Sequence, residues 1–585
     1  MTNEKMISKL FIKLLPIQIF LVIIGGINSV IDSTFASNLI GPDAMAVTGL
    51  FYPGVTLVNA INNLLFTGAE LLCGRYLGKK MAERTKSIFT IDMISISIIA
   101  GIIIIISELI PNQISFFLGA RGELIGQLSS YIRGYVIGLL PFCIGTQLTA
   151  FLQLEQKEKY SYASIGVMMA SNCFFNWLFI SKLGLSFFGL GLSTSISNFL
   201  FFLIQALYYF TGKASTGFSI KSIKMEDLPL ILKNGIPGSI TQVCILIRGL
   251  ILNYLIQHFV GTDGLSALAS VMSFGNLYWA ASAGVSSAVM LLASIYVGEE
   301  NIDSIVILMK TFLKKGVLLV TCASAVYMAL SVPATNLYFH DPQSAVYQMT
   351  LMGFILFPLS CPFTVFFTGC SNYIHCLNNH EHFVRFASIF DGLIGVGGLS
   401  LILIPLLGMP GTWIAQIGGG FLLAIILIVF AIRQRGYFPK TFIDWLCIPE
   451  GFGVGEEDRL NIAINNYEDA VNISEKVYDF CIQKDGNKKR AMHSALCIEE
   501  LAINIVKHGF EEKKKHYIDL SVSYVKGEQV ICFKDDCRAF NPKEASDLFE
   551  PEDITHNIGL RIVSKISKSM TYQNTLGLNI ITIII

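Results

Sequence analysis

The sequence predicts a helical membrane bundle of about twelve spans in two parallel six-helix repeats, followed by a soluble α/β domain. Three observations predict it. The 585 residues are 53% hydrophobic, with a mean hydropathy of +0.59, which is typical of membrane proteins. Charge is uneven, because residues 441–585 carry 40 of the 84 charged side chains. Short motifs also recur at a fixed spacing of 220 residues.

The first apolar run, residues 10–41, carries one acid, Asp32. The run is longer than the ~20 residues that cross a bilayer. A carboxylate at the centre of a membrane helix costs about 2.5–3.5 kcal/mol on insertion scales. Two interpretations of Asp32 stay open: it reaches the interface near the end of its helix, or it forms a proton or cation site inside the bundle.

Apolar runs of spanning length predict the twelve helices. They lie near residues 12–36, 44–69, 87–109, 129–153, 160–181, 186–211, 233–259, 265–297, 305–331, 346–370, 383–406 and 410–432. Basic residues gather in segments 1–13, 73–86 and 212–233. The positive-inside rule therefore predicts a multi-pass plasma-membrane protein with both termini in the cytoplasm.

An internal repeat relates the two halves of the bundle. The matched positions are Gly41 and Gly261, Asp43 and Asp263, Tyr76 and Tyr296, Gly78 and Gly298, and Gly191 and Gly411. Six helices per half is an even number, so both halves enter from the same side. This predicts a parallel repeat about an axis along the membrane normal, with the site between or within the halves.

Composition also excludes several functions. A net charge of zero gives no support for nucleic-acid binding. The 13 cysteines include no C-x-x-C pair, so we expect neither a disulfide framework nor a zinc site. No G-x-x-x-x-G-K-[ST] motif occurs, so no P-loop engine drives export.

The bundle resembles the multidrug and toxic compound extrusion (MATE) transporters over roughly residues 10–435, with an amino lobe at 10–220 and a carboxyl lobe at 221–435. The motifs that carry the resemblance are Pro16 and Asp32 in the first helix, the loop 74–78, and segments 189–194 and 411–415. The resemblance implies an antiporter that exports amphipathic organic compounds and is coupled to H⁺ or Na⁺. It also implies an amino-lobe cation site at Asp32, Asn172, Asn176 and Thr194.

Asn176 departs from the family, which usually has a second acid there. An amide can coordinate a cation through its oxygen but carries no proton, so Asp32 would titrate alone. The alternative is that Asn172, Asn176 and Thr194 only hydrogen-bond between helices. Elsewhere in the membrane, Arg248 and Asp391 are expected to form an ion pair or contact substrate, and Asp92 is expected to reach a helix end.

A linker at 436–455 leads to a tail, residues 456–585, of soluble composition. Strands are predicted at 458–464, 516–526, 529–535 and 578–585, and helices at 467–483, 488–508 and 558–569. Glu500, Asn504 and His508 are spaced i, i+4 and i+8, so they project from one helical face. An acid, an amide and an imidazole in a row can hold Mg²⁺ and orient water near a phosphate.

The tail resembles the histidine-kinase-like ATPases of the anti-sigma-factor serine kinase branch. The resemblance rests on the Glu500–His508 helix, Asp535 after a strand, and Asn557 and Gly559 before a helix. It implies ATP and Mg²⁺, with Asn504 as the Mg²⁺ ligand, Glu500 as the activating base and Asp535 bonded to the adenine amino group. His508, Asn557 and Gly559 would lie beside the nucleotide. Cys537 and Asn557 stand where the family usually has glycine.

Three hypotheses of function follow. The first is the cation-coupled exporter of small organic substrates, with an ATP-binding tail that regulates it and docks a regulatory protein. The second is a membrane sensor whose tail phosphorylates a serine on an anti-sigma-antagonist-like partner. The third is a flippase for a lipid-linked precursor, which the scarcity of intramembrane Lys and Arg disfavours.

Overall fold

The computed structural model describes residues 4–35, 40, 43–79, 81–118, 120, 122–155, 157–211, 214, 216–336, 338–377, 380–449, 451–464, 467–510, 516–525, 527–538, 540–542, 558–575 and 578–585. Gly41 of the repeat and Asn557 lie outside the described residues. The helices that carry Asp32 and His508 are described, but the side chains of these two residues are not.

The first half of the bundle contains eight α-helices. They are α1 (Glu4–Phe35), α2 (Asp43–Gly78), α3 (Ala82–Leu109), α4 (Pro111–Phe117), α5 (Leu124–Val136), α6 (Leu139–Leu154), α7 (Glu158–Asn176), continued by the π-helix η2 (Trp177–Lys182), and α8 (Ser186–Phe210). A 3₁₀ turn, η3 (Ile220–Ser222), leads to the second half.

The second half repeats this plan with more breaks. Its helices are α9 (Asp227–Phe259), α10 (Thr262–Ser273), α11 (Gly275–Gly298), α12 (Ile302–Thr311), η4 (Phe312–Gly316), α13 (Val317–Ala329), α14 (Ser331–Asn336), α15 (Ala345–Leu356), η5 (Phe357–Ser360), α16 (Cys361–Leu377), α17 (Glu381–Ile389), η6 (Phe390–Gly398), α18 (Leu399–Leu407) and α19 (Met409–Arg435). A short helix, α20 (Phe442–Trp445), follows.

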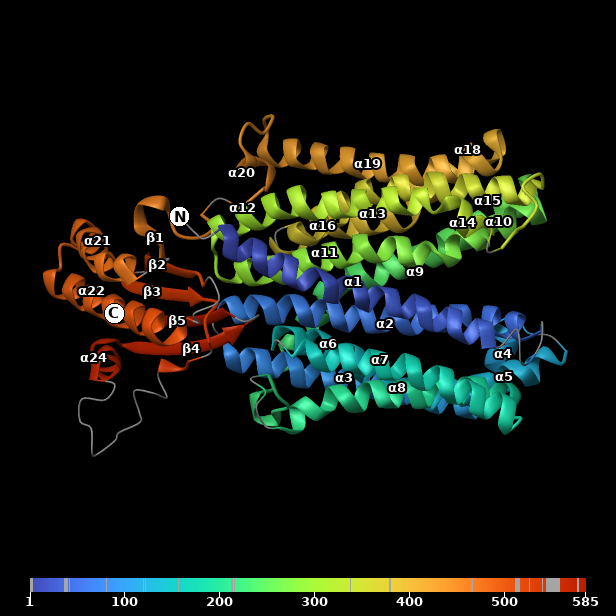
Figure 1. The fold of residues 1–585 in the computed structure, drawn as a ribbon, viewed down its shortest axis with the longest axis horizontal. Coiled ribbons are helices and arrows are strands. Elements are labelled where there is room, and N and C mark those ends of the chain that lie inside the picture. The colour runs from blue at the N-terminus through green and yellow to red at the C-terminus, as the bar shows by residue number, and fades with distance from the viewer. Residues whose placement is uncertain are drawn as a thin grey trace.

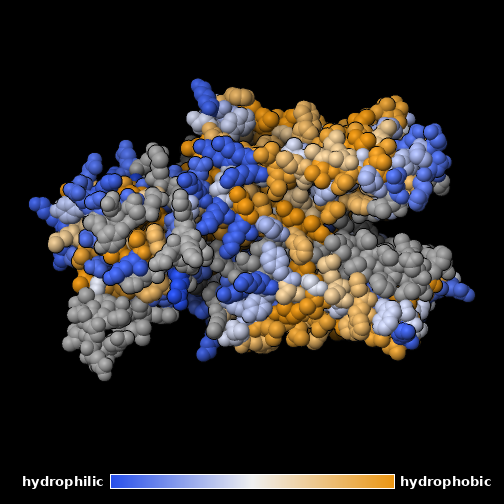
Figure 2. Space-filling model, in the orientation of Figure 1, coloured by the Kyte–Doolittle hydropathy of each residue, from blue (hydrophilic) through white to orange (hydrophobic). Residues whose placement is uncertain are grey.

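Each predicted span corresponds to one helical segment, several of which are built from two or three labelled helices. Among the described residues, nine helices are long and apolar enough to cross a membrane, and the bent pair α5–α6 makes a tenth. Large apolar side chains cover the outside of these helices, such as Leu109 at 75% and Phe210 at 79% exposed, as Figure 2 shows in orange. This surface suits lipid and not water.

The span predicted at 129–153 is bent by 48° between α5 and α6. The bend lies at Gly138, whose backbone N–H donates to Ser195 Oγ on α8 at 2.8 Å. A Cβ at Gly138 would overlap the backbone of Ser195. The close approach of α8 therefore requires glycine at this break.

The two halves meet through counterpart helices. Helix α1 packs on α11, and α9 packs on α2. A shift of 220 residues carries α1 onto α9 and the end of α2 onto α11, so the two contacts are equivalent in the repeat. Gly74 contacts its own counterpart, Ser294: a Cβ at Gly74 would lie 2.7 Å from Ser294 Cβ. A residue touches its counterpart only near a two-fold axis, so this contact supports the parallel repeat.

The tail lies at one end of the bundle, here called the near end; the opposite end is the far end (Figure 1). At the near end Arg75 of α2 donates to the carbonyls of His375 and Cys376, the former at 3.0 Å and the latter at 2.8 Å. These bonds join the two halves, because the acceptors belong to α16.

The described part of the tail is a five-stranded antiparallel sheet in the order β1-β2-β3-β5-β4, with α21, α22 and α24 on one face (Figure 1). Its elements are β1 (Arg459–Ile464), α21 (Tyr467–Asp485), α22 (Lys488–Gly509), β2 (Ile518–Val525), β3 (Glu528–Asp535), α24 (Ile558–Ile566), β4 (Ser569–Thr575) and β5 (Leu578–Ile584), with a 3₁₀ turn, η7 (Glu456–Asp458), before β1. The opposite face of β5 presents Leu578 and Ile580 to the bundle's hydrophobic core.

The prediction for the tail missed β4. The helix predicted to end at 569 ends at Ile566, and an edge strand follows. Among the described side chains of this strand Met570 alone is buried, so its sequence lacks the regular apolar alternation of an inner strand. All thirteen cysteines are free thiols in the structure.

Candidate functional site

Three of the four predicted cation-site residues lie together inside the amino half. Asn176 Nδ2 donates to Asn172 Oδ1 at 3.0 Å, and Asn172 Nδ2 lies 3.5 Å from Thr194 Oγ1. Ser193, which sequence reasoning missed, donates to Asn176 Oδ1. All four side chains are at most 5% exposed. Asn172 and Asn176 are spaced i, i+4, so they lie on one face of α7. Ser193 and Thr194 are adjacent on α8, which packs on α7, so the four groups can meet.

This amide network lies where α7 gives way to the π-helix η2, immediately after Asn176. Single π-turns within helices are frequent at functional sites, because they re-aim side chains and loosen the hydrogen-bond ladder. Helix α1 packs on α7, and Asp32 lies near the last turn of α1. The helix that carries Asp32 thus contacts the helix that carries the amides, although the Asp32 side chain lies outside the described part.

Elsewhere in the bundle, the ion-pair alternative for Arg248 and Asp391 and the expectation for Asp92 are wrong, whereas contact of Arg248 or Asp391 with substrate stays a prediction. Arg248 Nη1 donates to the backbone carbonyl of Asp391 at 3.1 Å, and the guanidinium lies over the Trp279 ring at 5.9 Å, so no ion pair with the Asp391 carboxylate forms. Asp92 does not reach a helix end: its side chain is fully buried, and both oxygens lack hydrogen-bond partners among the described residues. Glu70 on the adjacent α2 is also buried.

A cavity of about 270 Å³ lies in the tail between α22 and the ends of β3 and β5. Its lining includes two of the predicted nucleotide residues, Asn504 and Asp535, together with Ile505, Gly509, Cys537, Arg538, Phe540, Asn579 and Ile581. Asn579, which sequence reasoning did not single out, comes from the last strand.

Asp535 is held in this cavity by a fixed set of donors. Its Oδ1 accepts from Asn579 Nδ2 at 2.7 Å and from the Cys537 backbone N–H at 3.0 Å. The side chain is almost fully buried, and burial raises the pKa of this carboxyl, partly offset by these two hydrogen bonds. The Cys537 side chain also hydrogen-bonds this carboxyl and lowers its pKa, so Asp535 is held by groups from both β5 and the turn after β3.

Glu500 and Asn504 lie one turn apart on α22. Asn504 Nδ2 donates to the Glu500 carbonyl at 2.7 Å, which leaves its Oδ1 as a possible ligand. A Cβ at Gly559 would overlap the Glu500 carboxylate, so the start of α24 lies directly against the acid, whose side chain would have to move for a larger residue. The structure therefore joins Glu500 to the helix start that was predicted to meet phosphates, whereas Asn557 and the His508 side chain lie outside the described residues.

The tail is joined to both halves of the bundle by ion pairs. Lys9 Nζ on α1 lies 2.8 Å from Asp536 Oδ2, and Lys534 pairs with Glu299 at the end of α11. Arg459 Nη2 lies 3.1 Å from Asp303 Oδ2. We call these three pairs the junction.

Lys534 and Asp535 are consecutive on β3, so one points to the bundle and the other into the tail cavity. Burial lowers the pKa of Lys534, but the Glu299 carboxylate outweighs it, so the pKa lies above its usual value.

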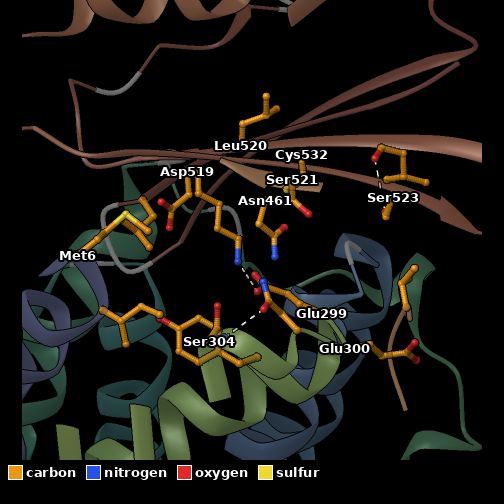
Figure 3. A pocket seen from close by; sticks show the side chains of 18 of the residues that line it. Met6, Glu299, Glu300, Ser304, Asn461, Asp519, Leu520, Ser521, Ser523 and Cys532 are labelled. Atoms are coloured by element: carbon orange, nitrogen blue, oxygen red, sulfur yellow. Dashed lines mark hydrogen bonds and ion pairs between the residues drawn. The ribbon is translucent and has the colours of Figure 1, made fainter. Parts of the chain in front are cut away.

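A second cavity, of about 190 Å³, lies within the junction. Figure 3 shows Asn461 reaching from the sheet toward Glu299, beside Asp519 and Ser521 of β2 and opposite Ser304 of α12. Asn461 Nδ2 donates to Asp303 at 2.7 Å. The contact between the tail and the bundle thus combines these polar side chains with the apolar contact that Leu578 and Ile580 of β5 make with the bundle's core.

Comparison with known proteins agrees with this architecture. The MatE family model matches residues 16–178 and 237–380, and the model of the histidine kinase-like ATPase domain matches residues 466–585. The chain belongs to the MatE family, a class of multi-pass membrane proteins, and carries a histidine kinase-like ATPase domain at its end.

Curated relatives include the Multidrug export protein MepA of Staphylococcus aureus, 27% identical over 241 residues, which are 40% of this chain and 52% of the relative. The protein of the same name from Staphylococcus saprophyticus is 27% identical over 252 residues, or 54% of its length. The chain thus spans about half the length of the curated relatives it matches.

Solved structures share the fold of the bundle. An outward-facing multidrug resistance MATE family transporter of the MOP superfamily aligns with a TM-score of 0.67 at 20% identity, over 72% of this chain and 94% of that one. A MOP superfamily transporter from Pyrococcus furiosus aligns with a TM-score of 0.68 at 19% identity, over 75% and 99%. At this identity the likeness shows the fold alone.

Proposed function

We propose that the chain is a cation-coupled antiporter that exports amphipathic organic compounds across the plasma membrane. The observation that carries the proposal is the buried network of Asn172 and Asn176 on α7 with Thr194 on α8. Helix α1, which carries Asp32, packs on α7. Buried polar groups in a membrane helix are costly and mark ion pathways. The names of the curated relatives, which describe multidrug export, support the substrate class.

In this mechanism Asp32 takes up H⁺ or Na⁺ and the neighbouring amide oxygens complete the site. Asn176 cannot bind a proton, so each cycle moves one proton at most through this group. Cargo leaves through the far end while the Arg75 contacts hold the near end closed, and rocking of the halves reverses the arrangement.

The test is efflux of ethidium from proteoliposomes under an imposed H⁺ or Na⁺ gradient. We expect Asp32→Asn to abolish gradient-driven efflux and Asn172→Ala to reduce it by about tenfold or more, because a lost cation ligand costs at least ~1.4 kcal/mol. Asp263→Asn, an exposed acid on α10, is the matched control and should transport normally. Full efflux by Asp32→Asn would remove the cation site from the mechanism.

We further propose that the tail binds ATP with Mg²⁺ and regulates transport from the cytoplasm. The basic loops near this end support a cytoplasmic location for both termini. Asp535 would accept from the adenine amino group, Asn504 would ligate Mg²⁺, and the start of α24 at Gly559 would meet the phosphates. The junction supports regulation, because Lys9 belongs to the first half, while Glu299 and Asp303 belong to the second.

A rocking motion that opens the near end must move the Lys9 attachment on the first half away from the Glu299 and Asp303 attachments on the second half. A tail bound to both halves therefore opposes this opening. ATP added on the tail side of proteoliposomes should change the efflux rate of the full chain, and Asp535→Asn should abolish the change without altering the basal rate. An identical ATP response in Asp535→Asn would contradict the nucleotide role.

One observation favours a second activity for the tail. The Glu500 carboxylate lies against Gly559, and if the phosphates of a nucleotide met this helix start, Glu500 would be a base beside the transferable phosphoryl group. The alternative is thus a serine kinase that acts on a docked regulatory protein. Purified full chain should then transfer labelled phosphate from ATP to a serine of such a partner, and Glu500→Gln should abolish the transfer.

A further inference from the structure

A cluster of three potential metal ligands lies where the tail meets α1. His516 precedes β2, and Asp536 and Cys537 follow β3; one ligand atom from each lies within 4.8 Å of the others. The register that pairs Ile518 with Asp535 brings these residues together beyond the paired ends of the two strands. Residues twenty apart in the sequence thus form one site, which no motif with short spacing could reveal.

The hydrogen bonding of His516 is incomplete. Its ring is 7% exposed, and Nδ1 lies 3.3 Å from both the backbone carbonyl and Oδ1 of Asp536. The other ring nitrogen, Nε2, is buried and has no hydrogen-bond partner among the described residues. Nδ1 is the ring nitrogen nearest Asp536 and so the one that can bind an ion there, whereas Nε2 lies on the other side of the ring and would not contact that ion.

The spacing suits a tetrahedral ion. Zinc binds nitrogen at about 2.0–2.1 Å and oxygen at about 2.0–2.2 Å, so the edge between two such ligands is about 3.4 Å. The His516 Nδ1 to Asp536 Oδ1 distance of 3.3 Å matches this edge. A set of one imidazole, one carboxylate and one thiolate favours zinc or cobalt over magnesium or calcium, which prefer oxygen alone.

We propose that His516, Asp536 and Cys537 bind a divalent ion of the zinc class, with the fourth position open to water. On binding, the Cys537 thiol releases its proton to solvent and the thiolate becomes a ligand. Asp536 also pairs with Lys9 Nζ at 2.8 Å, so the ion competes with the Lys9 ammonium for this carboxylate. Cys537 lines the cavity that holds Asp535, so the ion lies between that cavity and α1.

The first test titrates the full chain, purified in detergent and stripped of metal, with Co²⁺. We expect one ion per chain and a thiolate-to-cobalt charge-transfer band. Cys537→Ser should lose the band, and Cys532→Ser, a half-buried cysteine of β3, should keep it. A wild-type chain without the band, or an unchanged band in Cys537→Ser, overturns the proposal.

The second test begins with the wild-type chain, in which all three proposed ligands are present. Zinc should protect Cys537 of the wild-type chain from iodoacetamide, as measured on its peptide by mass spectrometry. His516→Gln should weaken this protection by about tenfold or more, since even groups that only support metal ligands contribute that much. Lys9→Met should strengthen it, because the competing ammonium is removed. Equal protection in His516→Gln, or weaker protection in Lys9→Met, overturns the proposal.

Discussion

Gly78 at the end of α2 packs directly against Gly298 at the end of α11, the residue 220 positions later in the repeat. A Cβ at Gly78 would lie 2.9 Å from the Gly298 carbonyl carbon, and a Cβ at Gly298 would overlap the Arg75 carbonyl oxygen. Two equivalent helices that touch at equivalent glycines cross close to the axis of the repeat. This contact closes the near end of the bundle and lies directly beneath the tail.

Substitution of Gly298 by Ala should force the near end apart. Overpacking a tight contact costs about 1–3 kcal/mol, and here the obstacle is backbone, which cannot move aside without moving α2. We expect a lower melting temperature and greater labelling of near-end groups by a soluble reagent. Gly101→Ala is the matched control, because a Cβ at Gly101 meets nothing within 4 Å. Equal melting temperatures for the two variants would show that the contact is loose.

Arg75→Ala should loosen the same end by another route. The guanidinium donates to the carbonyls of His375 and Cys376, and a hydrogen bond from a charged group contributes about 1.5–3 kcal/mol. We expect alkylation of the buried Cys376 thiol to rise by about tenfold or more, since 1.4 kcal/mol is a factor of ten. The exposed Cys322 provides the internal control and should react equally in both proteins. Unchanged protection of Cys376 would mean that the halves are held elsewhere.

The sequence predicted local features better than contacts between distant segments. Runs of apolar residues located the spans, because the bilayer fixes their length. The family resemblance singled out Asn172, Asn176 and Thr194, and the structure brings these three side chains together. The bend at Gly138 was not predicted, since it depends on the approach of Ser195 from another helix.

The ion pairs of the junction could not be predicted from the sequence either. Lys534 and Glu299 are 235 residues apart, and neither belongs to a motif. Their pairing depends on how the sheet docks on the bundle, which no local pattern encodes. Asp92 was misjudged for a related reason: its helical position was clear, but its complete burial depends on the helices packed around α3.

Asp535→Asn should separate nucleotide binding from stability. Burial raises the pKa of Asp535, so the ionised form costs folding stability once the pH exceeds that raised pKa. A neutral amide avoids this cost, and we expect a melting temperature equal to or above that of the wild type at pH 8. ATP affinity should fall by about tenfold or more, because an amide NH₂ would face the adenine amino group.

The ATP affinity of the wild-type chain should depend on pH through the same carboxyl group, Asp535. As the pH falls through the raised pKa, Asp535 becomes protonated and loses an acceptor, so ATP should bind more weakly at pH 5 than at pH 8. Isothermal titration at the two pH values measures this, with Asp535→Asn as the reference. A wild-type affinity that stays constant, or that rises toward pH 5, would contradict the adenine role of Asp535.

Lys534→Ala should detach the tail from the bundle. Removal of one partner from a buried ion pair costs about 3–5 kcal/mol, because the other charge is left without compensation; here Glu299 has a side chain only 9% exposed. Lys568→Ala is the matched control, since its pair with Glu528 is about half exposed and such pairs contribute about 0–1 kcal/mol. We expect faster proteolysis of the 436–455 linker in Lys534→Ala alone. Because Glu299 keeps the pKa of Lys534 above its usual value, the wild-type linker should stay protected up to alkaline pH. If both variants are cut at the wild-type rate, the docked arrangement does not depend on this pair, and regulation through β3 would need another route.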